Sequence, residues 1–152
     1  MKKLLLGLIF LIYACGYEPI YLNKNNDLTT FSRITLDGDK EINRKILNSL
    51  NIKQDTLIDS GNELIVKSSF KIEETAKNTK GKVVSYRSSA SVQFEITKNK
   101  KVLKDKIFYQ DFTYGNRDNK FDLVEYQKTI KNNIINKITE EIILYINLKW
   151  LL

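Results

Sequence analysis

The chain has 152 residues, enough for one compact domain and too few for two of ordinary size. It carries 25 Lys and Arg against 18 Asp and Glu, a formal net charge of +7, with one Cys, one Met and no His. One cysteine excludes an intrachain disulfide, and the scarcity of His, Cys and Met argues against an enzyme and a metal site. Only four of the basic residues are arginine, so the charge does not indicate nucleic acid, whose phosphates favour bidentate arginine.

The first fourteen residues have the organisation of a secretory signal peptide. Lys2 and Lys3 precede an apolar run over residues 4–13, which is too short to span a bilayer because spanning takes roughly 20 apolar residues. Ala14 then precedes Cys15, as in a bacterial lipobox, whose cysteine receives a diacylglyceryl group. The sequence therefore predicts three segments: a signal peptide over 1–14, a tether over 15–30 with a covalent lipid anchor on Cys15, and one α+β domain over 31–152.

A short strand and a helix open the predicted domain. Apolar and polar residues alternate over 31–36, which predicts a strand. Asp37 and Asp39 follow as expected capping residues of a helix that ends near Asn51. Its apolar residues recur at helical spacing, so they form one buried face: Ile42, Ile46, Leu47 and Leu50.

Two alternating runs come next, and they predict an antiparallel hairpin. One begins at Glu63 and the other covers 84–96, with a lysine-rich turn over 76–82 between them. The residues expected to face inward are Leu64, Val66, Phe70, Ile72, Val84, Tyr86, Ala90, Val92, Phe94 and Ile96.

A third strand is predicted over 102–114, beyond a turn at 98–101. The parity of its apolar residues changes along the run, which indicates either a bulge or burial on both faces. Its aromatic residues Tyr109, Phe112 and Tyr114 are expected in the core. Lysines surround both turns of this meander, which places them at opposite ends of the sheet.

A long helix over 120–147 closes the chain, with isoleucines four residues apart from Ile130 to Ile146. The order β-α-β-β-β-α predicts an α+β fold, in which a four-stranded, mainly antiparallel sheet carries two helices on one face. The place of the first strand, central or at an edge, stays open.

No catalytic constellation emerges from the polar residues. The neighbouring carboxylates at 73–74 and 140–141 diverge on a strand or a helix, and the serines have no histidine to activate them. Basic residues near the turns have two interpretations, a solubilising and edge-protecting charge set or contact with phosphorylated lipid or acidic loops of a partner. The candidates for such contact are Lys80, Lys82, Arg87, Lys98, Lys100 and Lys101.

The segment Cys15-Gly16-Tyr17-Glu18-Pro19-Ile20-Tyr21, together with this element order, resembles the lipopolysaccharide-assembly lipoproteins of the LptE family. The likeness is closest to their alphaproteobacterial branch, and it extends through the helix over 40–50, the strand that begins at Glu63 and the aromatic segment over 108–115. Gly16 rather than Asp after the cysteine implies export to the outer membrane.

The resemblance implies a non-enzymatic lipoprotein at the periplasmic face of the outer membrane. Such a protein plugs a large outer-membrane β-barrel of lipopolysaccharide transport, assists the assembly of that barrel and binds lipopolysaccharide, with no resident cofactor and no nucleic-acid partner. The basic candidates would then meet lipid A phosphates as point charges. Two alternatives stay open: another outer-membrane lipoprotein, such as a pilotin or a secretion-machine scaffold, and a periplasmic hydrolase or carrier with a deep pocket.

Overall fold

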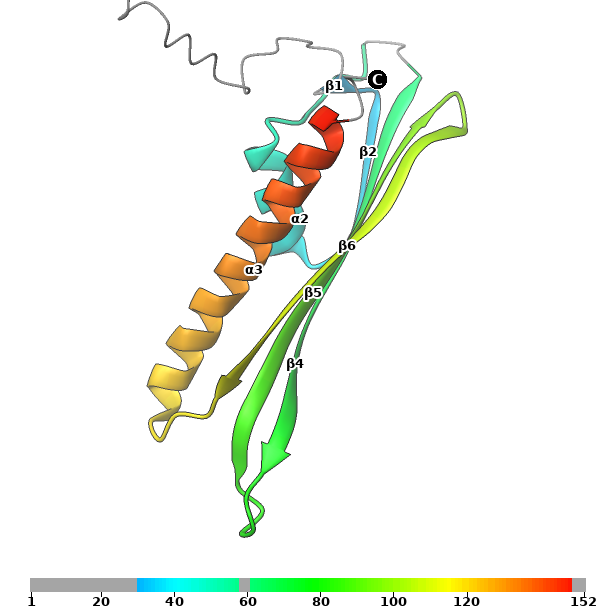
Figure 1. Cartoon of the computed structure of the whole chain (residues 1–152). Coiled ribbons are helices and arrows are strands. Elements are labelled where there is room, and N and C mark those ends of the chain that lie inside the picture. Colours follow the sequence, from blue (N-terminus) through cyan, green and yellow to red (C-terminus); the bar gives the residue numbers. More distant parts are fainter. Residues whose placement is uncertain (1–29, 58–60, 149–152) are drawn as a thin grey trace, which may run out of the picture.

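A four-stranded sheet with two helices on one face forms the body of the protein (Figure 1). The structure is a computed structural model that describes residues 30–57 and 61–148, so the predicted signal peptide, Cys15 and most of the tether lie outside the described residues. The sheet has the order β2-β4-β5-β6, and the elements are β1 (Thr30–Phe31), β2 (Arg33–Gly38), α2 (Lys40–Ser49), β3 (Lys53–Gln54), β4 (Asn62–Lys77), β5 (Val83–Lys98), β6 (Lys101–Gly115) and α3 (Lys120–Leu148). The α+β fold and its element order are confirmed.

The first long strand lies at an edge of the sheet. β2 pairs in parallel with β4, which requires a crossover connection, and α2 supplies most of it. β4, β5 and β6 form an antiparallel meander. The short strands β1 and β3 pair with each other in parallel. The sheet is therefore mainly antiparallel, with β2 and β6 as its two outer strands.

A bulge accounts for part of the mixed parity of β6. The register with β5 passes from Ile96 opposite Lys104 to Thr97 opposite Val102, so Leu103 is the extra residue. Burial on both faces, the alternative explanation, is wrong, because Ile107 is 64% exposed.

The prediction of three core aromatics in β6 is correct for one of them. Tyr114 is buried, and its ring packs at 5.9 Å from Tyr86 and 5.7 Å from Tyr126. Tyr109 and Phe112 are about half exposed, so their assignment to the core is wrong. Tyr109 belongs to the face of the sheet without helices, and Phe112 stands on an edge strand with a neighbour on one side only.

The core fills the space between the helices and one face of the sheet. α3 packs on β5 and β6, while α2 packs on β2 and β4. Every second side chain of β5 points into this space, because successive residues of a strand face opposite ways. The largest fully buried apolar side chains are Phe31, Ile42, Ile46, Leu64, Val66, Val92, Phe94, Phe108, Ile135, Ile138 and Ile142.

The sheet extends beyond the helices that cover it. β4 and β5 have 16 residues each, or roughly 50 Å at about 3.3 Å per residue, whereas the 10-residue α2 spans roughly 15 Å. Ile72 and Val84 were expected to be buried, yet they are 43% and 42% exposed. They lie near the hairpin end that projects past the helices in Figure 1, so their alternation predicts their face but not their burial.

Asp39 sets the start of α2. Its Oδ1 accepts hydrogen bonds from the backbone N–H groups of Glu41 and Ile42, at 2.9 and 3.0 Å, which satisfies two donors that the helix cannot pair itself. Asp37, the second expected cap, lies instead on β2 opposite Lys67. The prediction of a capping role for Asp37 is wrong, since the chain is still extended at that residue.

The two helices are joined by a charged cluster around Lys131 of α3. Its Nζ lies 3.0 Å from Asp39 Oδ2 and 2.8 Å from Glu41 Oε2. Partial burial alone would raise the pKa of Asp39, but hydrogen bonds from Ile42 and Lys131 and the charge of Lys131 outweigh it, so this pKa lies below its ordinary value. Burial alone would lower the pKa of Lys131. Its hydrogen bonds and charge interactions with Glu41 and Asp39 outweigh burial, so this pKa lies above its ordinary value.

Two glycines with positive φ predict unequal costs of substitution. Gly38 has φ +86°, and an added Cβ would lie 1.8 Å from the carbonyl oxygen of Ser68, whereas Gly81 has φ +75° and open space around it. Gly38→Ala is expected to lower the free energy of unfolding by about 3 kcal/mol or more, from backbone strain plus overlap. Gly81→Ala should cost about 1 kcal/mol. Urea unfolding measures both, and equal losses would contradict the close approach of β2 to β4.

The Asp39 carboxylate predicts a pH-dependent contribution to stability. Asp39→Asn keeps a capping oxygen but removes the charge, so at pH 7 it should lower the free energy of unfolding by about 1 kcal/mol. Because the folded pKa of Asp39 lies below its unfolded value of about 3.9, this difference should be complete above about pH 5. It should vanish as the pH falls through the folded pKa.

Urea unfolding of the wild type and Asp39→Asn across pH 2 to 7 measures this difference, and Asp39→Ala serves as the variant that also loses the cap. A difference that persists unchanged at the acid end would show that the charge of Asp39 does not contribute.

Candidate functional site

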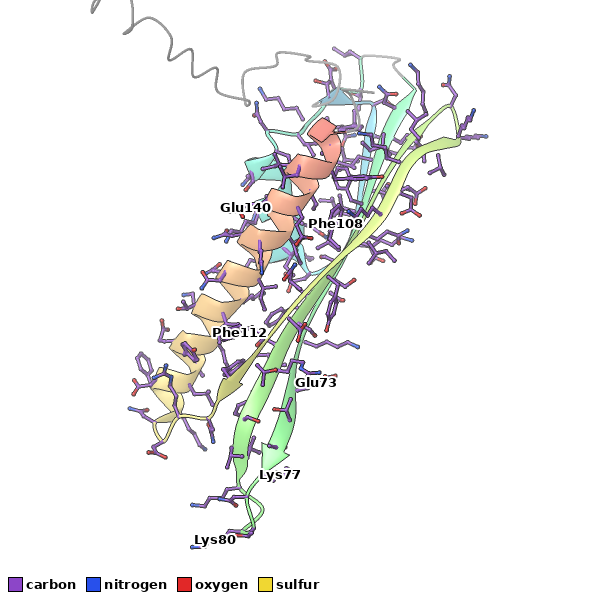
Figure 2. The ribbon with its side chains drawn as sticks, viewed as in Figure 1. Glu73, Lys77, Lys80, Phe108, Phe112 and Glu140 are labelled. Carbon is purple, nitrogen blue, oxygen red and sulfur yellow. The ribbon has the colours of Figure 1, made fainter. Side chains whose placement is uncertain are left out.

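The first group of predicted basic residues lies at the tip of the β4–β5 hairpin. The side chain of Asn78 organises this turn, because its Oδ1 accepts hydrogen bonds from the backbone N–H groups of Lys80 and Lys82, both at 3.0 Å. Both lysine side chains are exposed, and Figure 2 shows Lys80 at the far end of the molecule. The backbone of this turn is thus held by hydrogen bonds, and the turn presents two cations to solvent.

The second group surrounds the turn between β5 and β6. Asn99 and Lys100 form a two-residue turn with φ of 50° and 66°, the left-handed values that such hairpin turns require. Lys98 and Lys101 face each other directly across the two strands, and all three lysines are exposed. Like charges placed opposite each other destabilise a hairpin, so an anion at this turn would relieve a repulsion already present in the fold.

The structure keeps these two groups apart. They lie at opposite ends of the 16-residue strand β5, roughly 50 Å from each other, and no single headgroup reaches both. This is the separation that the meander predicts. Each turn is consequently a small cationic site of its own.

Arg87 belongs to neither group. It lies within β5, where its Nε is 3.5 Å from Asp111 Oδ2 and 3.3 Å from Thr113 Oγ1, and Glu73 occupies the opposite position on β4. Its side chain is about half exposed, but its charge is already compensated by neighbouring acids. The sequence could not show this, because Asp111 is 24 positions away along the chain.

The face of the sheet opposite the helices is open and polar. It is formed by the alternate residues of each strand, among them Ser69 of β4 and Ser89, Ser91 and Gln93 of β5. Acidic and basic side chains both occur on it, and its exposed apolar members, Val102, Ile107 and Tyr109, stand on the outer strand β6. Apart from these apolar side chains of β6, this face carries small and charged residues, which suits a hydrated environment.

The described residues form neither a metal-binding cluster nor a membrane-spanning helix. Among residues 30–57 and 61–148, no three His, Cys, Asp or Glu side chains are grouped so that they could hold a metal ion. Neither described helix is both long and apolar enough to cross a membrane.

Solved structures share this fold, although no protein-family model and no curated protein matches the sequence. Rare lipoprotein B from Shewanella oneidensis has a TM-score of 0.51 at 16% identity, over 77% of this chain and 98% of that one. A lipoprotein B from Nitrosomonas europaea gives 0.58 at 9% identity, over 75% and 82%. A minor lipoprotein from Acinetobacter baumannii gives 0.52 at 9% identity, over 78% and 92%. The chain therefore has a fold found in bacterial lipoproteins.

Proposed function

We propose that this protein is a lipoprotein anchored to the outer membrane through Cys15, which plugs the lipopolysaccharide-translocating β-barrel, assists its assembly and binds lipopolysaccharide during export. The observation that carries the proposal is the combination of two features. A lipobox cysteine followed by Gly16 begins the predicted mature chain, and the domain behind it has the fold of three solved lipoproteins. The role in lipopolysaccharide transport comes from the resemblance to the LptE family.

The shape and surface of the domain support a plug. The longest strands of the sheet run roughly 50 Å, and α3 packs along β5 and β6 (Figure 1), which gives the domain an elongated, braced form that suits a plug. The open face of the sheet is polar, which suits the water-filled interior of a large barrel. Acyl chains on Cys15 would hold the protein at the inner leaflet, at about 0.8 kcal/mol per buried methylene.

The two lysine-bearing turns support binding of a phosphorylated lipid. Lysine acts on phosphate as a point charge, and each turn presents its lysines on a backbone fixed by hydrogen bonds or by the turn geometry. Because the two turns are far apart, lipopolysaccharide would contact them at different positions along the molecule.

A pull-down of the tagged, lipidated protein from its own membranes in mild detergent tests the proposal, with identification of what stays bound. A large β-barrel in stoichiometric amount supports the plug. A secretin-like ring would assign the protein to the pilotins or secretion scaffolds instead, and the absence of any barrel would reject the plug. The matched control is Cys15→Ser, which removes the anchor and leaves residues 30–148 unchanged.

Neutralising each turn separately should weaken lipopolysaccharide binding without unfolding the domain. Lys80→Gln with Lys82→Gln forms one set, and Lys98→Gln, Lys100→Gln and Lys101→Gln forms the other. Each set is expected to reduce affinity roughly threefold to tenfold at physiological salt, since an exposed ion pair contributes about 0.2–1 kcal/mol. Binding of purified lipopolysaccharide measures the affinity, and thermal unfolding checks that the fold persists.

The control for this experiment is Lys53→Gln with Lys128→Gln, which removes two exposed charges that belong to β3 and α3 and to neither turn. Equal affinities of the wild type and both turn sets would refute the assignment. An equal loss in the control would mean that binding depends on net charge alone.

A further inference from the structure

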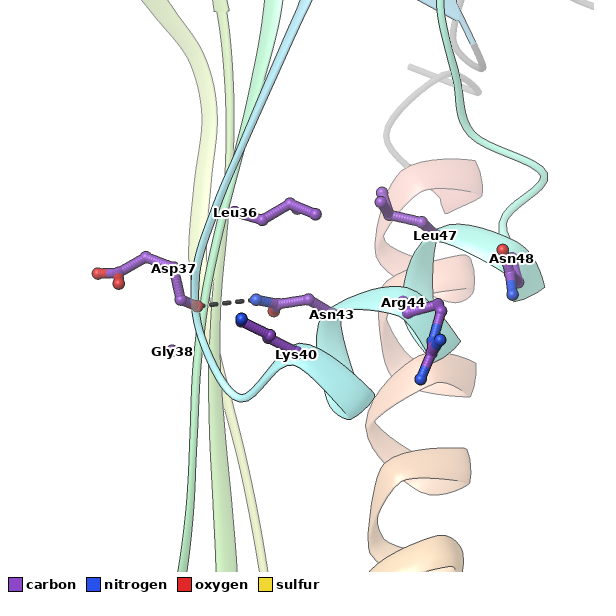
Figure 3. Close-up of a pocket in the computed structure, with 8 residues that line it drawn as sticks. All are labelled: Leu36, Asp37, Gly38, Lys40, Asn43, Arg44, Leu47 and Asn48. Carbon is purple, nitrogen blue, oxygen red and sulfur yellow. Dashed lines mark hydrogen bonds between the residues drawn. The ribbon is translucent and has the colours of Figure 1, made fainter.

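A pocket of about 590 Å³ lies between the outer strand β2 and helix α2 (Figure 3). This volume is within the range of about 300–1,000 Å³ that is usual for small-molecule sites. None of the six basic residues predicted from the sequence lines the pocket. It therefore belongs to neither lysine-bearing turn.

One face of α2 forms a wall of the pocket. Lys40, Arg44 and Leu47 lie four and three residues apart, so they share this face, and Leu36 of β2 stands across from them. In Figure 3 the two leucines lie at the upper end of the pocket, with Lys40 and Arg44 below them. The pocket is thus apolar at one end and cationic at the other.

The cations at this pocket have no acidic partner among the residues that the structure describes. Neither Lys40 nor Arg44 forms an ion pair, and both residues are exposed. Asp39 and Glu41, their neighbours on the chain, pair with Lys131 instead. Figure 3 shows the carboxylate of Asp37 on the side of β2 away from α2. The pocket therefore carries two uncompensated positive charges.

Asn43 adds an unsatisfied polar group to the pocket wall. Its side chain is 2% exposed, and its Nδ2 donates a hydrogen bond of 2.8 Å to the carbonyl oxygen of Asp37. Its Oδ1 has no hydrogen-bond partner within the described chain. Buried polar atoms are nearly always paired, so this oxygen calls for a hydrogen-bond donor that the described chain does not supply.

We infer that this pocket binds an acyl chain that carries an anionic headgroup, a phosphate or a carboxylate. The chain would lie between Leu36 and Leu47, and the headgroup would meet the Lys40 ammonium and the Arg44 guanidinium, which pairs with either anion through two hydrogen bonds. Leu36 is 45% exposed at the sheet edge, so a chain longer than the pocket has room to continue outward. The inference does not rest on the lipopolysaccharide proposal.

The test uses the predicted mature chain from residue 15 with Cys15→Ser, so that no attached lipid competes. Backbone amide signals of residues 36–48 are followed by NMR during titration with dodecyl phosphate, dodecanoate, inorganic phosphate and dodecyl maltoside, each amphiphile below its critical micelle concentration. Saturable binding of dodecyl phosphate or dodecanoate is expected, with inorganic phosphate and the neutral maltoside at least tenfold weaker. A preference between the two anionic amphiphiles identifies the headgroup.

Variants distinguish binding in the pocket from nonspecific effects of charge and of detergent. Lys40→Gln with Arg44→Gln should lower the affinity for the anionic amphiphiles at least tenfold, and Leu36→Ser should lower this affinity as well. Arg33→Gln with Lys53→Gln makes the same change of charge outside the pocket and should leave affinity unchanged. Unchanged binding in the pocket variants, or equal affinity for the maltoside or for inorganic phosphate, would overturn the inference. Because no probe is lipopolysaccharide, this result is independent of the proposed function.

Discussion

The burial of the α3 isoleucines against β5 and β6 is the contact on which the rest of the structure depends. Ile130, Ile134, Ile138 and Ile142 recur every four residues and are all buried, and each fully buried aliphatic side chain contributes about 1.5–3 kcal/mol. This contact decides which face of the meander becomes the core. It also leaves the other face of the sheet to solvent. One interface therefore decides which residues of each strand are buried and which form the surface.

Helix α2 is held to this framework by its buried residues Ile42 and Ile46 and by polar contacts at its N-terminal end. Asp39 caps α2, and the same residue pairs with Lys131 of α3. Gly38 lets β2 turn into the helix while its backbone touches Ser68 of β4. The short α2 covers only part of β4, which leaves the projecting hairpin bare and opens the pocket along the free edge of β2.

The distribution of charge follows from the same arrangement. The helix layer and the paired strands occupy the middle of the molecule, so the turn lysines stand at its ends. No described carboxylate pairs with Lys80, Lys82, Lys98, Lys100 or Lys101. Lys40 and Arg44 form a third cationic site. This site differs from the two turns because apolar side chains line the same pocket. The proposed anionic amphiphile would need a cation for its headgroup and an apolar wall for its chain, and of these three places the pocket combines both.

The sequence by itself determined the four strands of the main sheet, the two helices, their order and the inward parity of β5 and α3, because alternation and helical spacing depend on neighbours along the chain. It did not show the two-residue strands β1 and β3. It also determined that the two lysine-bearing turns lie at opposite ends of the sheet, because successive turns of an antiparallel meander alternate between its two ends. The tertiary structure alone decided that β2 is an edge strand, that Tyr109 and Ile72 are exposed, and that Arg87 pairs with Asp111. It alone brought Leu36 across from Leu47 to form the pocket. These features depend on which segments meet in space and how far a helix covers a strand, and local periodicity carries no information about either.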